Sequence, residues 1–212
     1  MSDIAVDEVT ALSVRDLDEL CEAADDAIRA GGGFGWLTPP ERSVMENYWR
    51  GVLLVPDRRL FIGRLDSVIV GSAQLQRSSK NNEAQAHAAR LTSHFVAPWA
   101  RGHGVARALL VAVENAARLQ GHATLELDVR ETQEAALQIY RHYGYTEWGR
   151  HPDYARVDGR PVGGLHFYKL LATNAGEGSS DPADSVALDA AARNGPARNG
   201  AAGVTNKADA PS

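Results

Sequence analysis

VAPWARGHGVARALLVAVENAARL, residues 96–119, is the stretch that decides the fold of this chain. A turn that contains Pro98, Gly102 and Gly104 leads directly into a segment whose apolar residues recur at helical spacing. The first amide groups of a helix have no partner inside the helix, and glycines keep side chains out of the turn, so such a junction is suited to binding an anion. The stretch therefore predicts a strand, a glycine turn and a helix over 105–119 that bind an anionic ligand.

The segments on either side of this stretch alternate between strand and helix patterns. Before it, we expect a strand over 4–9, a helix over 14–30, a second helix from 41 to about 49, two strands within 59–77 that turn near 66–67, and a third strand over 86–96. After it, we expect a strand over 123–129, a helix over 132–142, and strands over 145–150 and 165–171 with a turn at 157–160 between them. This order, β-α-α-β-β-β-α-β-α-β-β, predicts an α/β fold in which helices flank a mixed sheet.

The bulk composition bounds the class of protein. With 212 residues, of which 44% are hydrophobic and 23% charged, the chain can bury a core and is expected to form one domain with an appendage. The net charge of −5 argues against nucleic acid as a partner. No apolar run approaches the roughly 20 residues that span a bilayer, and the acidic start MSDIAVDEV is unlike a signal peptide. We expect a cytoplasmic protein that has no membrane partner.

The segment 172–212 differs from the rest of the chain in composition. It is rich in Ala, Gly, Asn, Asp, Ser and Pro, and its few sizeable apolar residues cannot bury enough surface to offset the entropy lost on ordering. The sequence therefore predicts a folded domain over 1–171 and a low-complexity, disordered tail over 172–212.

Cysteine and histidine usage argues against two kinds of site. The single Cys21 has no disulfide partner and no neighbouring ligand at metal-binding spacing, so a small apolar residue of a helix is the better interpretation. His87, His94 and His103 lack both the H-x-x-x-H spacing and the cysteine support of a metal site. We expect no metal.

Two common nucleotide-binding patterns are absent from the glycine turn. The sequence has no G-x-x-x-x-G-K-[ST], and the pattern G-x-G-x-x-G stops after Gly102-His103-Gly104. The strand before the turn also comes late in a run of three strands, whereas a dinucleotide-binding strand opens a βαβ unit. The anion is therefore expected to belong to a ligand other than ATP or NAD.

Two runs of the sequence together resemble a known family. FVAPWARGHGVARALL, residues 95–110, and LELDVRETQEAALQIYRHYGY, residues 125–145, are similar to the central motifs of the GNAT N-acetyltransferase superfamily, in the same order and at similar spacing. Those motifs are a V-x-P-x-x-R-G-x-G-[VI]-[GA] loop and a later A-x-x-[LI]-Y-x-x-x-G-[FY] helix end. The resemblance covers most of residues 3–171 and implies a largely antiparallel sheet and acetyl-CoA as the co-substrate.

The resemblance also implies which residues hold acetyl-CoA. The loop that would bind the pyrophosphate through its backbone N–H groups consists of Arg101, Gly102, His103, Gly104, Val105 and Ala106. The backbone of Phe95 and Val96 would bind the pantetheine arm as an added strand does. Many relatives have Asn seven residues before the tyrosine of the second motif; here that residue is Gln133, whose amide has a longer reach.

The same comparison implies a general acid and leaves the general base open. Tyr140 stands at the position of the family's general-acid tyrosine, where its phenol would protonate the leaving thiolate. Many relatives have a glutamate where this chain has Arg90, and a guanidinium cannot accept a proton at neutral pH. We favour Asp128 as the base, directly or through water, with His94 and Glu126 as alternatives.

A looser likeness bears on the acceptor. AIRAGGGFGWLTPP, GSAQLQ and GRHPDYARVDGRPVGGLHFYKLL resemble the tabtoxin-resistance type of acetyltransferase, which acetylates a small amine. The family's architecture implies an acceptor pocket formed by the loop between the first two helices and the connection between the last two strands, where Phe34, Trp36 and Tyr154 would line it.

These observations predict transfer of an acetyl group from acetyl-CoA to a primary amine of a small molecule. Two alternatives stay open: an acyl-CoA-binding sensor with little or no catalysis, which Arg90 suggests, and a protein N-acetyltransferase. The sequence also leaves a homodimer open.

Overall fold

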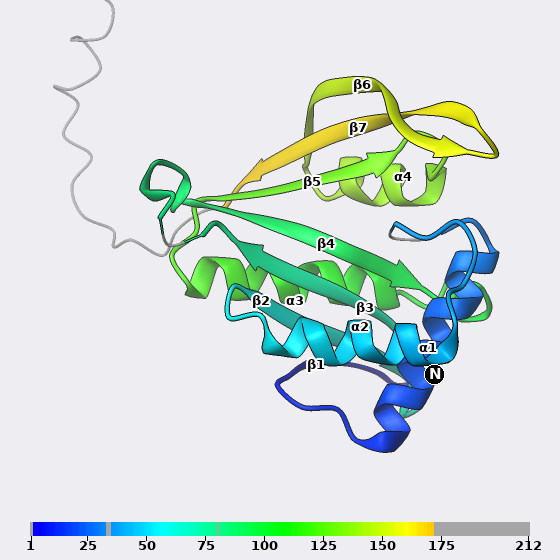
Figure 1. Cartoon of the computed structure of the whole chain (residues 1–212). Coiled ribbons are helices and arrows are strands. Elements are labelled where there is room, and N and C mark those ends of the chain that lie inside the picture. The colour runs from blue at the N-terminus through cyan, green and yellow to red at the C-terminus, as the bar shows by residue number, and fades with distance from the viewer. Residues whose placement is uncertain (1, 33–34, 80, 172–212) are drawn as a thin grey trace, which may run out of the picture. The chain divides into compact units, whose positions relative to one another are not determined.

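The fold is built on one sheet of seven strands, which lie in the order β1-β2-β3-β4-β5-β7-β6 (Figure 1). The computed structural model describes residues 2–32, 35–79 and 81–171; Phe34 and the predicted tail over 172–212 lie outside the described residues. The strands are β1 (Ile4–Val9), β2 (Arg58–Leu65), β3 (Val68–Arg77), β4 (Ala88–Val96), β5 (Thr124–Arg130), β6 (Thr146–Val157) and β7 (Arg160–Leu170). Among the strands of the described residues, only β4 and β5 pair in parallel, so the sheet is mixed and largely antiparallel.

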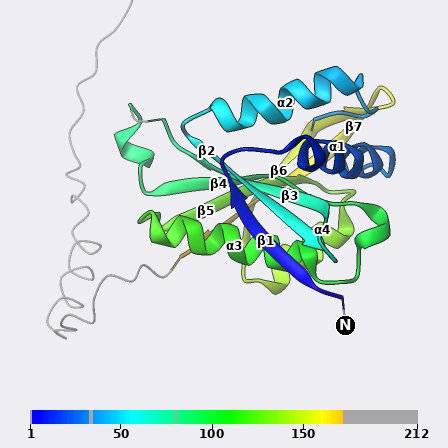
Figure 2. The ribbon, with the colours of Figure 1, turned by 90° about the horizontal axis from the view of Figure 1, so that it is seen from below.

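Helices cover both faces of the sheet. They are α1 (Val14–Arg29), α2 (Arg42–Leu54), α3 (Val105–Leu119) and α4 (Glu134–His142), with short 3₁₀ turns at 83–85 and 98–100. Helices α1 and α2 lie on one face and α3 and α4 on the other (Figure 2), and each pair closes its own apolar cluster against the strands. The element order and the α/β fold class predicted from the sequence are confirmed.

Local sequence explains why α1 begins and packs as it does. Ser13 and Asp16 form a reciprocal capping box at its start, which pairs two backbone N–H groups that the helix itself leaves open. The predicted apolar stripe is buried against β3 and β4, and Cys21 within it is 1% exposed. Desolvation raises the pKa of the Cys21 thiol to about 11, so Cys21 is a packing residue.

Helix α2 is longer than the sequence predicts. We expected it to end near residue 49, but it continues through Gly51 to Leu54. Met45, Trp49 and Val52 recur at helical spacing and are all buried, and this packing outweighs the cost of about 1 kcal/mol that a glycine brings to a helix interior.

The final hairpin is also longer than predicted, because 151–157 and 160–164 are strand where we expected a connection. Pro152 lies in a register irregularity between His151 and Ala155, which hides the alternation that would reveal a strand. The predicted turn is present, with Asp158 at φ 49° and Gly159 at φ 76°. Helix α4 begins at Glu134, two residues later than expected.

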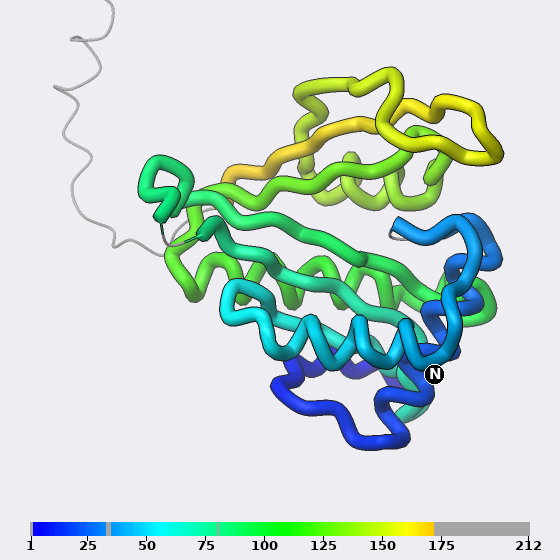
Figure 3. The backbone as a smooth tube through the Cα atoms, in the orientation of Figure 1, coloured from blue at the N-terminus to red at the C-terminus, as the bar shows by residue number. Residues whose placement is uncertain are grey.

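Strands β4 and β5 separate along their length, and this separation positions the site. They pair over only three residues each, Ala88–Arg90 with Thr124–Glu126, and then diverge toward their carboxyl ends (Figure 3). Among the described residues, no backbone pairing joins β4 and β5 beyond Arg90 and Glu126. The cleft where they diverge is lined by residues of both strands.

Candidate active site

A bulge in β4 shapes the cleft. Thr92 pairs with Gln74 and Phe95 pairs with Ser72, so Ser93 and His94 together stand opposite Ala73 of β3. Ser93 has a φ of 49°, in the left-handed region that non-glycine residues rarely adopt. A bulge of this kind twists a strand and re-aims its side chains.

The predicted anion-binding loop lies at the start of α3. Gly102 and Gly104 have φ values of 83° and 91°, and both residues are exposed. The first helical hydrogen bond runs from the amide of Ala108 to the carbonyl of Gly104, so the amide groups of 105–107 have no acceptor in the helix. Such groups, together with the positive end of a helix dipole, are suited to binding an anion. Binding of a pyrophosphate here stays a prediction.

His103 in this loop is turned back onto the backbone. Its Nδ1 lies 3.1 Å from the carbonyl oxygen of Arg101 and 3.3 Å from that of Ala100. Both partners can only accept, so Nδ1 donates and His103 stabilises the turn. Nothing in this geometry makes it a base at the cleft.

Tyr140 and His94 meet on the side of the sheet that α3 and α4 cover. The Tyr140 hydroxyl lies 3.0 Å from Nδ1 of His94, and Nε2 of His94 lies 3.0 Å from the carbonyl oxygen of Ala106 in the first turn of α3. Tyr140 is 5% exposed, and its ring packs against the rings of Tyr145 and Phe167. One hydrogen-bonded chain therefore joins α4, β4 and the start of α3.

Desolvation sets the protonation of both side chains. Desolvation lowers the pKa of His94 to about 4, so the imidazole is neutral at physiological pH. Desolvation, and to a lesser extent the charge of Asp128, raises the pKa of the Tyr140 phenol above its ordinary value. His94 is thus a poor general base, and Tyr140 keeps its proton.

Asp128 approaches the cleft from the other side of the sheet. Leu125 and Leu127 are buried in the cluster beneath α3, so the alternating Glu126 and Asp128 lie on the opposite face. The guanidinium of Arg90 lies 3.2 Å from the carboxylate of Asp128 and 3.8 Å from that of Glu126. Arg90, the residue that departs from the family pattern, is therefore the counter-ion of both candidate carboxylates.

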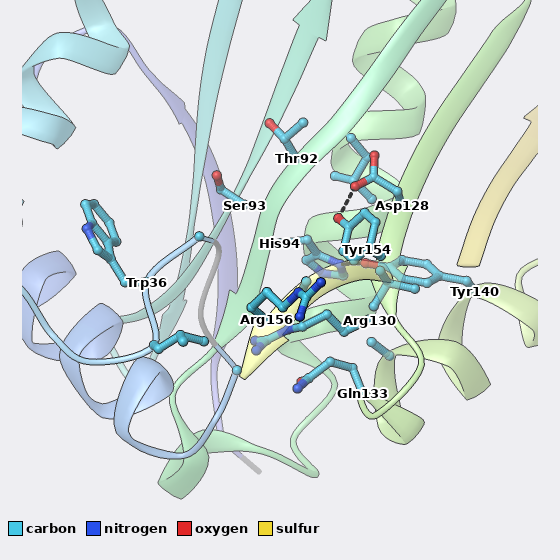
Figure 4. A pocket seen from close by; sticks show the side chains of 17 residues that line it. Trp36, Thr92, Ser93, His94, Asp128, Arg130, Gln133, Tyr140, Tyr154 and Arg156 are labelled. Carbon is cyan, nitrogen blue, oxygen red and sulfur yellow. Dashed lines mark hydrogen bonds between the residues drawn. The ribbon is translucent and has the colours of Figure 1, made fainter. Parts of the chain in front are cut away.

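Tyr154 of β6 completes this carboxylate site. Its hydroxyl donates to the second carboxylate oxygen of Asp128, so both oxygens of Asp128 have a partner (Figure 4). Desolvation and the bond to Asp128 raise the pKa of Tyr154 above its ordinary value. Tyr154 was predicted to line the acceptor pocket; it also orients the proposed base.

One cavity of about 690 Å³ joins these groups. It is bounded by β4, β5, α4, β6 and the loop between α1 and α2 (Figure 4). Trp36 lines this cavity, with its ring edge-on to Tyr48 at 5.1 Å between centroids. Its role in acceptor binding stays a prediction. The residues from the predictions that line it are Trp36, His94, Asp128, Gln133, Tyr140 and Tyr154.

Gln133 also has a protein partner. Its side-chain amide donates to the carbonyl oxygen of Gly31 at 2.8 Å, and a guanidinium nitrogen of Arg130 donates to the same oxygen at 2.8 Å. These two bonds tie the chain just after α1 to the chain around the start of α4. A pantetheine contact by Gln133 stays a prediction.

Four polar residues at the cavity were missed by sequence reasoning: Thr92, Ser93, Arg130 and Arg156. Arg130 could have been found, because it follows Glu126 and Asp128 on the same face of a strand with a period of two. Arg156 could not, because 151–157 was expected to be a connection. Arg156 also pairs with Asp153 at 2.6 Å.

Comparison with known proteins gives a consistent result. Residues 17–145 match the profile of the acetyltransferase (GNAT) family. An uncharacterized N-acetyltransferase from the hisH–hisA intergenic region of Azospirillum brasilense is 63% identical over 133 residues, which cover 63% of this chain and 79% of the relative.

Solved structures have the same fold. An N-acetyltransferase from Staphylococcus aureus Mu50 superposes with a TM-score of 0.67 at 17% identity, covering 80% of this chain and 99% of the other. The protein yncA of Salmonella typhimurium, solved with its cofactor acetyl-CoA, gives a TM-score of 0.64 at 14% identity over 83% of this chain and 98% of the other.

Proposed function

The chain belongs to the acetyltransferase (GNAT) family, and from this premise we propose that it moves the acetyl group of acetyl-CoA to the primary amine of a small molecule. Membership makes the chain an acyltransferase of an acetyl-CoA-dependent family. The observation that carries the finer proposal is the cavity of about 690 Å³, which brings Tyr140 and Asp128 together from opposite faces of the sheet.

The residues around the cleft fit acetyl-CoA. Beyond its pairing with β5, strand β4 offers backbone groups at Phe95 and Val96 to the amides of pantetheine, as an added strand would use them. The exposed loop from Arg101 to Ala106 offers N–H groups to the pyrophosphate. Acetyl-CoA supplies the activated acetyl thioester when it is bound.

Asp128 and Tyr140 are the groups that accept and donate protons during the transfer. The carboxylate of Asp128, which pairs with Arg90, accepts a proton from the acceptor's ammonium or from an intervening water and so leaves the amine neutral and nucleophilic. Tyr140 offers the proton that a thiolate needs on leaving. Because the pKa of the phenol is raised, Tyr140 is protonated throughout the neutral range.

The cavity favours a small acceptor with an anionic group. Its charged lining residues are Asp128, Arg130 and Arg156, and Asp128 already has Arg90 as its counter-ion. Arg130 donates to the Gly31 carbonyl and Arg156 pairs with Asp153, but a guanidinium has five N–H donors, so both can also bind a carboxylate or phosphonate of the acceptor. Trp36 supplies an apolar wall. An amino-acid-like compound has both the primary amine that is acetylated and the anionic group that the guanidinium groups would bind.

The two alternatives differ from this proposal in what they require of the same residues. The sensor hypothesis rested on the loss of a glutamate at Arg90, but Arg90 pairs with another carboxylate, so the departure does not imply lost catalysis. The protein-acetylation hypothesis takes an N-terminal peptide as acceptor. It has fold-level support from a ribosomal-protein-alanine N-acetyltransferase of Brucella melitensis at 20% identity and a TM-score of 0.65.

A turnover assay separates these hypotheses. CoA release is measured with three acceptor sets: amino acids, the same compounds with the carboxylate converted to an amide, and short peptides with free N-termini. The proposal predicts turnover with the first set and a higher KM for the amides. Turnover of the peptides alone would favour protein acetylation, and tight acetyl-CoA binding without any turnover would favour the sensor.

A further inference from the structure

The His94 imidazole has both of its nitrogens engaged. Nδ1 lies 3.0 Å from the Tyr140 hydroxyl and Nε2 lies 3.0 Å from the Ala106 carbonyl oxygen, and the rings of His94 and Tyr140 are 5.9 Å apart between centroids. The ring therefore bridges the tyrosine beside the cleft and the first turn of the anion-binding helix.

Hydrogen-bond chemistry decides which atom donates in each bond. A carbonyl oxygen only accepts, so Nε2 of His94 must carry a hydrogen and donate to Ala106. A neutral imidazole has one N–H, which leaves Nδ1 with a lone pair. Nδ1 then accepts, and the Tyr140 hydroxyl donates its single proton to His94.

We propose that His94 is a positioning residue that takes the Tyr140 hydroxyl as a donor and ties it to the first turn of α3. This inference rests on the proposed function, because it gives Tyr140 a task at the cleft. In the free protein Tyr140 presents oxygen lone pairs to a ligand. Donation to a leaving thiolate breaks the bond between the hydroxyl and Nδ1. As the C–N bond forms and the C–S bond breaks, the phenol proton moves to sulfur and the phenolate takes a proton from the nitrogen that has attacked. The proton that Asp128 took from the ammonium is released to solvent, and His94 stays neutral throughout.

The groups around His94 support a neutral imidazole that orients the Tyr140 hydroxyl and does not ionise. Around the cavity, α4 contributes the uncharged phenol Tyr140, β6 contributes Tyr154 and Arg156, and β5 contributes Asp128, which is held by Arg90, and Arg130. Among the hydrogen bonds of the described residues, His94 has one to Tyr140 and one to the Ala106 carbonyl, so Tyr140 is its only link to these groups. Its role is thus distinct from that of a general base, the hypothesis raised for it from the sequence.

Nitrogen NMR on the unaltered protein tests this assignment without any turnover. With ¹⁵N-labelled histidine, and with the His94→Asn spectrum used to assign the resonance, we expect one neutral tautomer with hydrogen on Nε2 from about pH 5 to about pH 8. Tyr140→Phe should shift the Nδ1 resonance and leave the tautomer unchanged. A hydrogen on Nδ1, or an imidazolium that forms near pH 6.5, would overturn the proposal.

Two matched variants separate positioning from simple packing. In His94→Asn, the side-chain oxygen can still accept from Tyr140, whereas His94→Leu leaves the hydroxyl without an acceptor. We expect kcat to fall about 10- to 100-fold in His94→Leu and to recover most of the loss in His94→Asn, with the acetyl-CoA dissociation constant within about twofold in both. In the Tyr140→Phe background the two variants should be equal, because the coupling is lost.

The outcomes separate the two proposals. Equal kcat values for the Asn and Leu variants at unchanged stability would contradict the positioning role. If the unaltered protein turns over no amine, the proposed function fails, and the NMR measurement on the free protein still decides the tautomer and the donor in the bond between Tyr140 and His94.

Discussion

The guanidinium of Arg90 lies 3.2 Å from the carboxylate of Asp128, so the residue that departs from the family pattern holds the carboxylate that we propose as the base. The pair is partly exposed, at 49% and 27% of the two side chains, so we expect it to orient Asp128 more than to stabilise the fold. Arg90→Gln should lower kcat several-fold and leave acetyl-CoA affinity unchanged.

A charge-conserving control sharpens this expectation. Arg90→Lys should retain most of the activity, and Arg90→Glu should be less active than Arg90→Gln, because it places a third carboxylate beside Asp128 and Glu126. Steady-state kinetics on the three variants provides the measurement. A glutamate variant that outperforms the glutamine variant would show that a base belongs at position 90 and that Asp128 is not it.

Removal of the Tyr140 hydroxyl should affect the chemical step. Tyr140→Phe keeps the ring contacts with Tyr145 and Phe167 but removes the proton donor, so we expect kcat to fall about 10²-fold or more. Acetyl-CoA affinity, measured by calorimetry, should stay within about twofold. Tyr143→Phe, on the same helix end but outside the cavity, is the matched control and should be silent. Normal turnover by Tyr140→Phe would remove Tyr140 from the mechanism.

The glycine loop should matter to acetyl-CoA binding. A Cβ at Gly102 would meet no atom within 4 Å, so the cost of Gly102→Ala comes only from its φ of 83°. The strain costs about 1–2 kcal/mol. A change of loop conformation that removes this strain would displace the N–H groups of the loop, so we expect acetyl-CoA to bind about tenfold more weakly.

The control for this substitution is Gly51→Ala in α2. It also has open space around its Cβ but lies in a helix interior, so it should raise the free energy of unfolding by about 0.5–1 kcal/mol and leave acetyl-CoA binding unchanged. Calorimetric titration of both variants is the measurement. Equal acetyl-CoA affinity in the two would contradict the assignment of the loop.

The depressed pKa of His94 makes stability depend on pH. The unfolded chain binds a proton at His94 below about pH 6.5, whereas the folded chain does so only below about pH 4. The free energy of unfolding should therefore fall on acidification between these values, with a His94 contribution of at most about 1.4 kcal/mol per pH unit.

Comparison with a variant isolates that contribution. Hydrogen bonds and ion pairs lower the pKa of Asp16, Glu19 and Glu131, so these carboxylates add slopes of the same sign at lower pH. Their contribution should be common to the unaltered protein and His94→Asn. Denaturant unfolding of the two proteins at a series of pH values should give curves that converge as the pH falls toward 4. Parallel curves would mean that His94 titrates normally in the folded state.

The parts of the site that sequence could predict are those encoded locally. The junction around Gly102 and Gly104 and the position of Tyr140 lie in continuous sequence motifs. The periodicity of apolar residues also predicted the order of helices and strands that the structure has. Contacts between distant segments could not be predicted. His94 and Tyr140 are 46 residues apart, and they meet because a bulge at Ser93 re-aims β4.

The acceptor side of the cavity was the least predictable part. Tyr154 was expected there from family resemblance, but its bond to Asp128 depends on β6 continuing past Pro152, which the sequence pattern hides. The bonds of Arg130 and Gln133 to the Gly31 carbonyl likewise join segments about a hundred residues apart, and no local signal marks them. Tertiary packing decided these contacts.

The guanidinium groups at the cavity give a prediction about the acceptor. Arg156→Gln should raise KM for an amine that carries a carboxylate and leave KM for the matching amide unchanged, because one charge-assisted contact is lost. Asp153→Asn, which removes the present partner of Arg156, should lower the same KM or leave it unchanged. Initial-rate kinetics with the paired compounds checks this, and a parallel rise for both compounds would argue against an anionic acceptor.

The central claim is transfer of an acetyl group to a small amine at Tyr140 and Asp128. Its most direct test is mass spectrometry of the products formed when the full chain, acetyl-CoA and a defined mixture of small amines and N-terminal peptides are incubated together. We predict an acetylated small amine whose formation rate falls at least about tenfold in both Tyr140→Phe and Asp128→Asn. Acetylation of the peptides alone, or small-amine acetylation at an unchanged rate in both variants, would contradict it.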